Sequence, residues 1–408
     1  MVDILIVGGC YITIGDGGNI IYNNIGIKDG IITYIGDQKI PARKIINANN
    51  MIIFPGFINT HIHFGEYFLK GYDAKYTTEE YILYAEDFNN RNVQYKEQIR
   101  QVSTDIVMCE ALKYGTTTLM GIRGWNCAEK YGARLFMGYP LMKSDKLQDY
   151  LVNAFDNIDK LKADELNEYF VALHSLKWVD DEILTNLSQY MKRNMNIKLS
   201  VHICETRDEV NYIKKKYGMT PIEVMEKYEL LSGRTLLVHC NYLSDKDIDI
   251  IKKYNASVAI CPNSNLKLKN RIAPVKKLLK KGINVTLGTD GIATNDSLNL
   301  LDSCRTLGLI TDIKSIDIIK MITINPEKYF QKNIGEIKIG NKADILIFDK
   351  RNLQITRDET FINDLVYANG IVPNTVIING KIIISDEQKI NKEEIYKQKD
   401  ELIKNLKF

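Results

Sequence analysis

The chain lacks the cysteine pattern of a disulfide framework or of a cysteine-built zinc site. Its seven cysteines, among 408 residues, are an odd number, lie scattered along the chain and form no CxxC pair. Disulfide-rich secreted domains and thiolate zinc sites both depend on closely spaced cysteine pairs. We therefore expect reduced thiols and a cytoplasmic protein.

Long apolar runs and an excess of charge are also missing. No stretch approaches the ~18 to 20 apolar residues that a membrane helix needs, and the first apolar run is broken by Gly8 and Gly9. The 54 basic and 51 acidic residues are interspersed, without the basic stripe that nucleic-acid binding uses. We expect a small-molecule substrate, no membrane and no nucleic acid, and the sequence leaves a homo-oligomer open.

Histidine is scarce, and its placement is the strongest signal in the chain. All five histidines lie at or just beyond the ends of apolar segments that are typical of strands: His61, His63, His174, His202 and His239. Neutral imidazole is the commonest side-chain metal ligand and a common acid or base near neutral pH. The placement therefore indicates a metal-dependent enzyme in which nearly all histidines serve one site.

The centre of the chain predicts an α/β fold of the (β/α)8 TIM-barrel type. Short apolar strands alternate with amphipathic helical stretches, a pattern of parallel strands joined by helical crossovers. In such barrels the catalytic groups lie at the carboxyl ends of the strands. Eight strands are expected, at residues 52–60, 115–121, 133–139, 169–174, 197–202, 235–239, 257–261 and 284–289.

The two ends of the chain predict a second unit. Residues 1–50 and 335–386 consist of short alternating strands with turn signals such as Asn379-Gly380, which is typical of a β-meander or hairpin. We expect them to pair into one small composite β-sandwich beside a catalytic barrel of residues 51–334. Residues 387–408 predict a surface helix with a narrow apolar stripe, formed by Ile395, Leu402 and Leu406.

The most specific motif is the segment PGFINTHIH, which ends in His61 and His63. Alternate residues of a strand point to the same face, so both imidazoles enter the barrel mouth together. Further along, His202 and His239 end other predicted strands, and Asp290 follows another. Imidazoles with one carboxylate form a ligand set suited to zinc or ferrous iron.

These motifs resemble those of the amidohydrolase superfamily, in its mononuclear deaminase and chlorohydrolase branch, which includes deaminases of S-adenosylhomocysteine and 5'-methylthioadenosine. The resemblance covers nearly the full chain and rests on these stretches: PGFINTHIH, VHICETRDEV, LLVHC, CPNSNLKL, RIAPV and LGTDGIATNDSLNL.

The resemblance implies that one divalent metal, zinc before iron, is held by His61, His63, His202 and Asp290. It also implies that Glu205, His239 and Asp290 carry out the proton transfers. The chemistry is consistent, because a bound dication lowers the pKa of its water toward ~7. Asp290 would accept a water proton, Glu205 would protonate the substrate's ring nitrogen, and His239 would stabilise the charge on the attacking oxygen.

Substrate contacts are expected from His174, where the family carries a substrate-contacting histidine, and from Glu205. Lys177 and Arg123 would mark an anionic substrate, or else a solvated surface. The stretch from Asn263 to Leu268 is either an ordinary capped helix start or, as the resemblance suggests, a border of the substrate cleft.

We expect a metal-dependent aminohydrolase that deaminates an amino-substituted heteroaromatic ring of purine nucleoside type, such as S-adenosylhomocysteine, 5'-methylthioadenosine or adenosine. Alternatives within the superfamily are deamination of guanine, pterin or cytosine, hydrolysis of a formimino group, and triazine-type dechlorination. The alternative from a different class is a non-catalytic barrel scaffold, which would be expected to have lost metal ligands.

Overall fold

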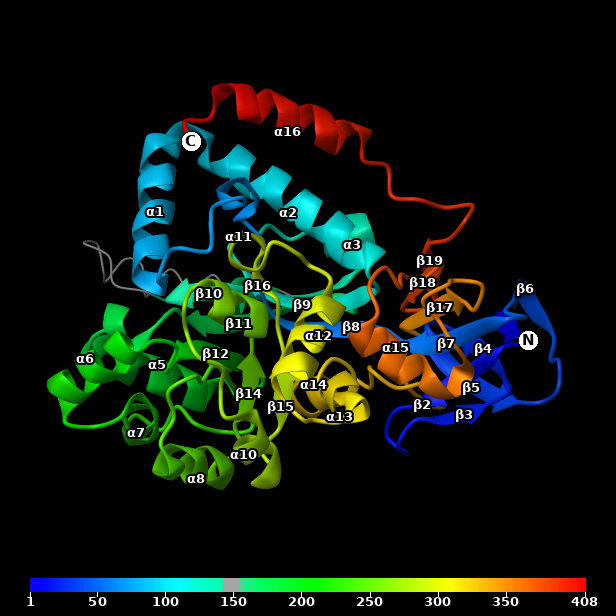
Figure 1. Cartoon of the computed structure of the whole chain (residues 1–408), viewed down its shortest axis with the longest axis horizontal. Coiled ribbons are helices and arrows are strands. Elements are labelled where there is room, and N and C mark those ends of the chain that lie inside the picture. The colour runs from blue at the N-terminus through cyan, green and yellow to red at the C-terminus, as the bar shows by residue number, and fades with distance from the viewer. Residues whose placement is uncertain (142–154, 156–157, 162) are drawn as a thin grey trace.

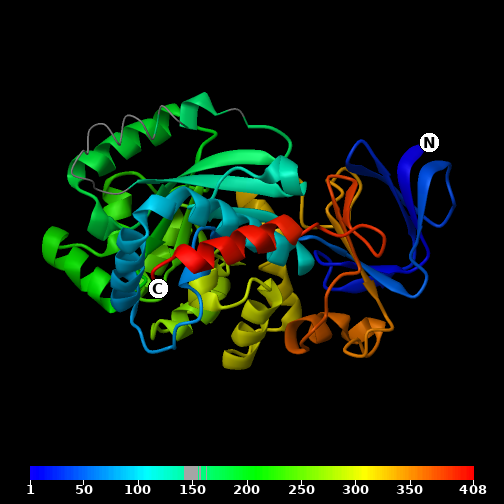
Figure 2. The same cartoon turned by 90° about the horizontal axis from the view of Figure 1, so that it is seen from above.

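The computed structural model describes residues 1–141, 155, 158–161 and 163–408. A large parallel sheet surrounded by helices occupies one part of the molecule. Two smaller sheets, built from both ends of the chain, lie beside it (Figures 1 and 2).

The large sheet is parallel and curled, as in a TIM-like barrel. Its last two strands are separated only by Gly288 and Thr289, and the final strand pairs with the first one in the sheet. Thr60 reinforces this closure by donating a hydrogen bond to the Leu287 carbonyl, 2.9 Å away. The strands, in chain order, are β8 (Phe57–His63), β9 (Thr116–Ile122), β10 (Arg134–Leu141), β11 (Asn167–Leu173), β12 (Lys198–Ile203), β13 (Thr235–His239), β14 (Ser257–Ile260), β15 (Val285–Leu287) and β16 (Asp290–Gly291).

Helices follow the strands and lie around the outside of the sheet (Figure 2). Several begin at side-chain caps, such as the reciprocal box of Thr77 and Glu80 at the start of α1, which satisfies backbone N–H groups. Within the described ranges, no helix combines the length and apolarity needed to cross a membrane. The α-helices are α1 (Thr78–Arg91), α2 (Lys96–Lys113), α3 (Ala128–Tyr131), α5 (Asp181–Arg193), α6 (Arg207–Tyr217), α7 (Pro221–Lys227), α8 (Asp245–Lys253), α9 (Pro262–Lys267), α10 (Val275–Lys280), α11 (Ile292–Asn295), α12 (Leu300–Ile310), α13 (Ser315–Lys320), α14 (Ile324–Phe330), α15 (Phe361–Tyr367) and α16 (Glu393–Asn405), and the 3-10 turns are η1 (Tyr67–Leu69), η2 (Val93–Tyr95), η3 (Leu176–Trp178) and η4 (Asp358–Thr360).

The strand expected over residues 52–60 is in fact two strands. β7 (Met51–Pro55) belongs to a smaller sheet, and β8 begins after Gly56. The pairing of β8 with β9 shifts register between Asn59 and Ile62. Ile58 packs inside the barrel and Ile62 outside it, although simple alternation would place both on one face. A bulge of this kind re-aims side chains, and here it directs His61 and His63 inward.

Strands from both ends of the chain form the two smaller sheets. A four-stranded sheet contains only amino-terminal strands, whereas a six-stranded sheet joins β2, β3 and β7 to carboxyl-terminal strands. Buried residues of both sheets, including Ile6, Ile27, Ile53 and Ile345, belong to one hydrophobic cluster. The strands are β1 (Val2–Val7), β4 (Asn24–Lys28), β5 (Ile31–Gly36) and β6 (Ala42–Asn47) in the first sheet, and β2 (Cys10–Thr13), β3 (Asn19–Ile21), β7 (Met51–Pro55), β17 (Ile345–Asp349), β18 (Thr375–Ile378) and β19 (Lys381–Ile384) in the second.

The carboxyl-terminal helix α16 lies alongside α2 (Figure 1). Ile395, Leu402 and Leu406 are buried, and the last two share a cluster with Tyr81 and Phe88 of α1. Helix α16 thereby braces the two helices that follow β8.

A separate apolar cluster fills the barrel interior. Phe330 of α14 is fully buried and lies against Phe136 of β10, with ring centroids 4.2 Å apart. Tyr329 donates a hydrogen bond to the carbonyl of Leu199, at the start of β12. Helix α14 therefore contributes side chains to the packing of the barrel interior.

We predict that Phe330→Ala lowers the free energy of unfolding by about 3–5 kcal/mol, because truncating a buried aromatic ring leaves a cavity. Denaturant titration followed by circular dichroism measures the change. The control is Leu353→Ala, since Leu353 is 96% exposed and its loss should alter stability by less than about 0.5 kcal/mol. Equal stability of the two variants would contradict the packing role of Phe330.

Candidate metal centre and active site

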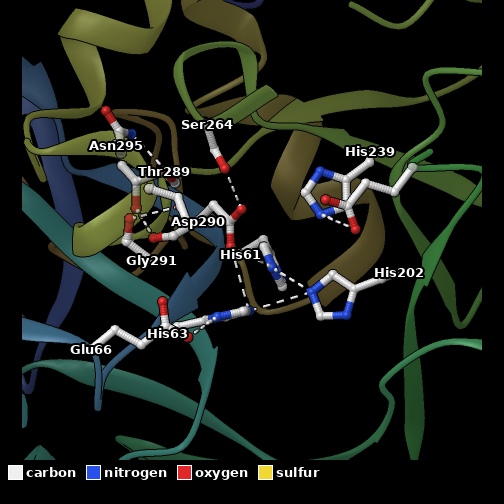
Figure 3. A network of polar contacts seen from close by, with 12 residues as sticks. His61, His63, Glu66, His202, His239, Ser264, Thr289, Asp290, Gly291 and Asn295 are labelled. Carbon is white, nitrogen blue, oxygen red and sulfur yellow. Dashed lines mark hydrogen bonds and ion pairs between the residues drawn. The ribbon is translucent and has the colours of Figure 1, made fainter. Parts of the chain in front are cut away.

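Four buried side chains converge at the carboxyl ends of three strands. His61 and His63 end β8, His202 lies near the end of β12, and Asp290 begins β16. One ligand atom from each side chain can be chosen so that all four lie within 4.8 Å of one another. Figure 3 shows these side chains pointing toward a common centre.

The spacing of the donor atoms fits a single small cation. The Nε2 atom of His202 lies 3.0 Å from that of His61 and 3.3 Å from that of His63. Asp290 Oδ1 lies 3.4 Å from both His61 Nε2 and His63 Nε2. Ligands at ~2.0 to 2.1 Å from a tetrahedral zinc ion are separated by roughly 3.3 Å. A divalent metal therefore fits the donor set and its spacing.

Neighbouring groups orient three of these ligands. His63 Nδ1 lies 2.7 Å from Glu66 Oε1, and His202 Nδ1 lies 2.8 Å from the carbonyl oxygen of His174. Both contacts leave Nε2 free for a metal, the arrangement that outer partners commonly impose on ligating histidines. Ser264 donates a 2.6 Å hydrogen bond to Asp290 Oδ2, which leaves Oδ1 toward the centre.

The electrostatics of the site favour the binding forms of three of the four ligands. At the fourth, His63, burial alone would lower the pKa, but the carboxylates of Glu66 and Asp290 outweigh it and raise that pKa. Burial lowers the pKa of His61 to about 4, and it lowers the pKa of His202 well below the usual value. Burial alone would raise the pKa of Asp290, but the imidazoles of His63 and His61 outweigh it and hold that pKa well below its usual range. Neutral imidazole and ionised carboxylate are the states that bind metals.

Glu205 and His239 lie beside the four ligands. His239 Nε2 is 3.8 Å from Glu205 Oε2, and His239 Nδ1 is 3.0 Å from Asn265 Oδ1. Thr78, at the start of α1, donates a 3.3 Å hydrogen bond to Glu205. Burial, with a further contribution from Asp290, raises the pKa of Glu205 to about 8. A carboxyl group with that pKa can hold and release a proton near neutral pH.

Two of these residues have an unusual backbone conformation. His239 has φ of 75° and Asp290 has φ of 61°, in the left-handed region that side chains other than glycine seldom adopt. Each such residue costs roughly 1–3 kcal/mol, and such strain concentrates at functional sites. His239 is the last residue of β13 and Asp290 lies beyond the end of β15, so the strain accompanies the turn of these side chains toward the centre.

Besides Glu205, three substrate contacts were predicted, and they differ in exposure: Arg123 is exposed, whereas His174 and Lys177 are half-buried. Arg123 donates to Glu66 at 2.8 Å, and its other terminal nitrogen is 3.1 Å from His174 Nε2. Burial, followed by the charge of Arg123, lowers the pKa of His174 to about 3. Lys177 lies half-buried in η3, where its backbone N–H donates to the hydroxyl of Ser175.

Sequence reasoning overlooked Glu66 and left Ser264 and Asn265 undecided. The stretch from Asn263 to Leu268 contributes to α9, and it also contacts Asp290 and His239. The helix is present, but Ser264 and Asn265 do not cap it, since its N-cap is Cys261 without a side-chain hydrogen bond; the border of a substrate cleft stays a prediction. Glu66 follows His63 by three residues, and that short spacing was the available signal.

Comparison with known proteins places this site in a family. The model of the amidohydrolase family matches residues 52–383. The chain belongs to the amidohydrolase family. The expected superfamily is thereby confirmed, and the chain is a hydrolase.

Curated relatives are similar over nearly the whole chain. A 5-methylthioadenosine/S-adenosylhomocysteine deaminase from Caldicellulosiruptor saccharolyticus is 28% identical, covering 99% of this chain and 97% of its own. A 5'-deoxyadenosine deaminase from Methanocaldococcus jannaschii is 30% identical, covering 94% and 96%. A crystal structure of an adenosine deaminase from Xanthomonas campestris with bound zinc has a TM-score of 0.90, 21% identity and 99% coverage of both chains, so the fold is shared.

We predict that His202→Ala lowers the bound metal well below the wild-type amount, because it removes one of four converging donors. Metal analysis of purified protein by inductively coupled plasma mass spectrometry measures the content. His174→Ala is the matched control, since the imidazole of His174 is not one of the four donors. Full metal retention by the His202 variant would remove this residue from the ligand set.

Proposed function

We propose that the protein is a metal-dependent aminohydrolase that deaminates a purine nucleoside-type substrate. The observation that carries this proposal is the placement of Glu205 and His239 beside the four-donor centre. A non-catalytic scaffold would not need acid–base groups next to a complete donor set.

A divalent ion held by His61, His63, His202 and Asp290 would supply Lewis acidity that makes water a nucleophile near neutral pH. We propose that Asp290 accepts a proton from the attacking water. Glu205 would pass a proton to the ring nitrogen next to the reacting carbon. His239, oriented by Asn265, would hydrogen-bond the attacking oxygen and stabilise its developing charge.

The substrates proposed are S-adenosylhomocysteine, 5'-methylthioadenosine, 5'-deoxyadenosine and adenosine. Support comes from the names of the similar proteins, which between them specify deamination of all four compounds. We propose zinc as the metal, with iron as the alternative. His174 and Glu205 are proposed as substrate contacts, and Arg123 and Lys177 as groups at the edge of the site.

The division of the chain is also a proposal. Residues 1–50 and 335–386 would form the composite β-sandwich, supported by the cluster that both small sheets share, with Met51–Pro55 adding a strand. Residues 51–334 would form the (β/α)8 barrel and 387–408 the surface helix. A cytoplasmic location is proposed because all seven cysteines are free.

Ammonia release tests the reaction. Metal-assayed protein is incubated with the four adenosyl-type compounds and, in separate reactions, with guanine, a pterin, cytosine and N-formimino-L-glutamate. Chloride release from a chlorotriazine is measured in parallel. We expect release of ammonia from at least one adenosyl-type compound, whereas chloride release alone, or ammonia from the other compounds alone, would replace this substrate class with one of the alternatives.

We predict that Glu205→Gln keeps the wild-type metal content while kcat falls by ~10² to 10⁴, as expected for loss of a general acid or base. Steady-state kinetics with the best substrate, together with metal analysis, measures both quantities. Glu97→Gln serves as a control, because Glu97 forms an exposed ion pair with Arg100 on α2. An unchanged kcat in the Glu205 variant would exclude this residue from proton transfer.

A further inference from the structure

Glu66 is a buried carboxylate for which the proposed mechanism has no use. It lies three residues after His63, and its side chain is only 3% exposed. A buried ionised carboxylate is costly unless charged or hydrogen-bonding partners surround it. The identity of its partners therefore indicates what it does.

Three donors surround the two carboxylate oxygens. Oε1 lies 2.7 Å from His63 Nδ1 and accepts a 2.8 Å hydrogen bond from Arg123. Oε2 accepts a 3.0 Å hydrogen bond from Tyr81 of α1. Because the carboxylate accepts from His63 Nδ1, the proton is held on that nitrogen and Nε2 is left with a free lone pair.

Gly291 of β16 has no side chain, and the Glu66 carboxylate occupies the space beside it. A Cβ atom at Gly291 would lie 2.0 Å from Glu66 Oε2, so any other residue at this position would collide with the carboxylate. Figure 3 shows Glu66 pointing toward the ring of His63. The carboxylate is thus confined by packing as well as by hydrogen bonds.

Arg123 extends the contact to a second part of the site. One terminal nitrogen binds Glu66, and the other lies 3.1 Å from His174 Nε2. A guanidinium can only donate, so Nε2 of His174 accepts and the ring proton is assigned to Nδ1. The buried Nδ1 atom has no hydrogen-bond partner within the described part of the chain. His174 is therefore left with one N–H donor to offer.

We propose that Glu66 is a positioning residue that orients the ligand His63 directly and the side chain of His174 through Arg123. The inference rests on the proposed function, since it takes His63 as a metal ligand. It assigns Arg123 a role in fixing His174 rather than in binding an anionic substrate, because Glu66 already neutralises its charge.

The first experiment measures metal affinity rather than activity. Metal-free wild type, Glu66→Gln and the matched control Glu209→Gln are titrated with Zn²⁺ against a chelator of known affinity. Glu209 is also a buried carboxylate, yet it contacts Ser175 and the Glu205 N–H and no predicted ligand. We expect Glu66→Gln to weaken zinc binding by about 10- to 100-fold, the range for lost outer partners of ligands, and Glu209→Gln to bind as wild type does.

A spectroscopic readout separates orientation from general destabilisation. The visible absorption of the Co²⁺-substituted protein depends on coordination geometry, and it should change in Glu66→Gln but not in Glu209→Gln. Tyr81→Phe, which removes only one hydroxyl from the network, should cause a smaller change in the same direction. This milder variant keeps the test decisive if Glu66→Gln folds poorly.

The second arm tests the connection to His174. Arg123→Gln should keep the wild-type zinc affinity, because Glu66 still contacts His63, while kcat/KM falls roughly ten- to a hundredfold, the size of a lost hydrogen bond to a charged group. If Arg123 instead bound an anionic substrate directly, only substrates with a carboxylate would lose kcat/KM, and that selectivity would overturn the assignment.

The outcomes distinguish this inference from the proposed function. Wild type that binds about one metal and releases ammonia, together with a Glu66→Gln variant of wild-type zinc affinity and Co²⁺ spectrum, would overturn the positioning role alone. Wild type that binds no metal after reconstitution would overturn both. If Glu66→Gln and Glu209→Gln weakened zinc binding equally, the loss of any buried carboxylate would explain the effect, and this result would also overturn the inference.

Discussion

The convergence of three imidazoles and one carboxylate on a single buried point is the constraint on which the rest of the active site depends. The separations of 3.0 to 3.4 Å between donor atoms bring lone pairs together at distances suited to ligands of one cation. Buried ionisable groups without compensation destabilise a fold. A divalent cation at this point would therefore compensate the charge of Asp290 and join side chains from three strand ends.

The groups around the ligands follow from this constraint. Each imidazole must present Nε2, so its Nδ1 needs a partner, and Glu66 and the carbonyl of His174 supply two of them. Asp290 must present one oxygen, and Ser264 occupies the other. These partners come from the segments that follow β8 and β11 and from α9, which are distant in sequence but meet at one end of the curled sheet.

Proton transfer depends on the same burial. Burial and the nearby charge of Asp290 raise the pKa of Glu205. The environment that brings the metal ligands together therefore also sets the pKa of this acid. The first turn of α1 covers this carboxylate through Thr78, and α16 braces α1 from outside. The outer helices thereby influence how closely the site is enclosed, although they contribute no metal ligand.

The sequence by itself determined the family, the alternation of strands and helices, and the residue types of the metal centre, because His61, His63, His202 and Asp290 stand in short motifs at strand ends. It could not reveal the division of residues 52–60 into β7 and β8, nor the bulge that turns both histidines of β8 inward. Strand alternation is a local rule, whereas a bulge depends on the pairing partner.

The tertiary structure alone decided the environment of each site residue. Glu66, Arg123 and His174 come from three different strand ends, and only closure of the sheet brings their side chains within hydrogen-bond distance. Ser264 and Asn265 likewise gain their roles from facing Asp290 and His239. Short sequence motifs show which residue types can bind a metal or transfer a proton. Tautomers, pKa values and ligand orientation instead arise from contacts between distant segments.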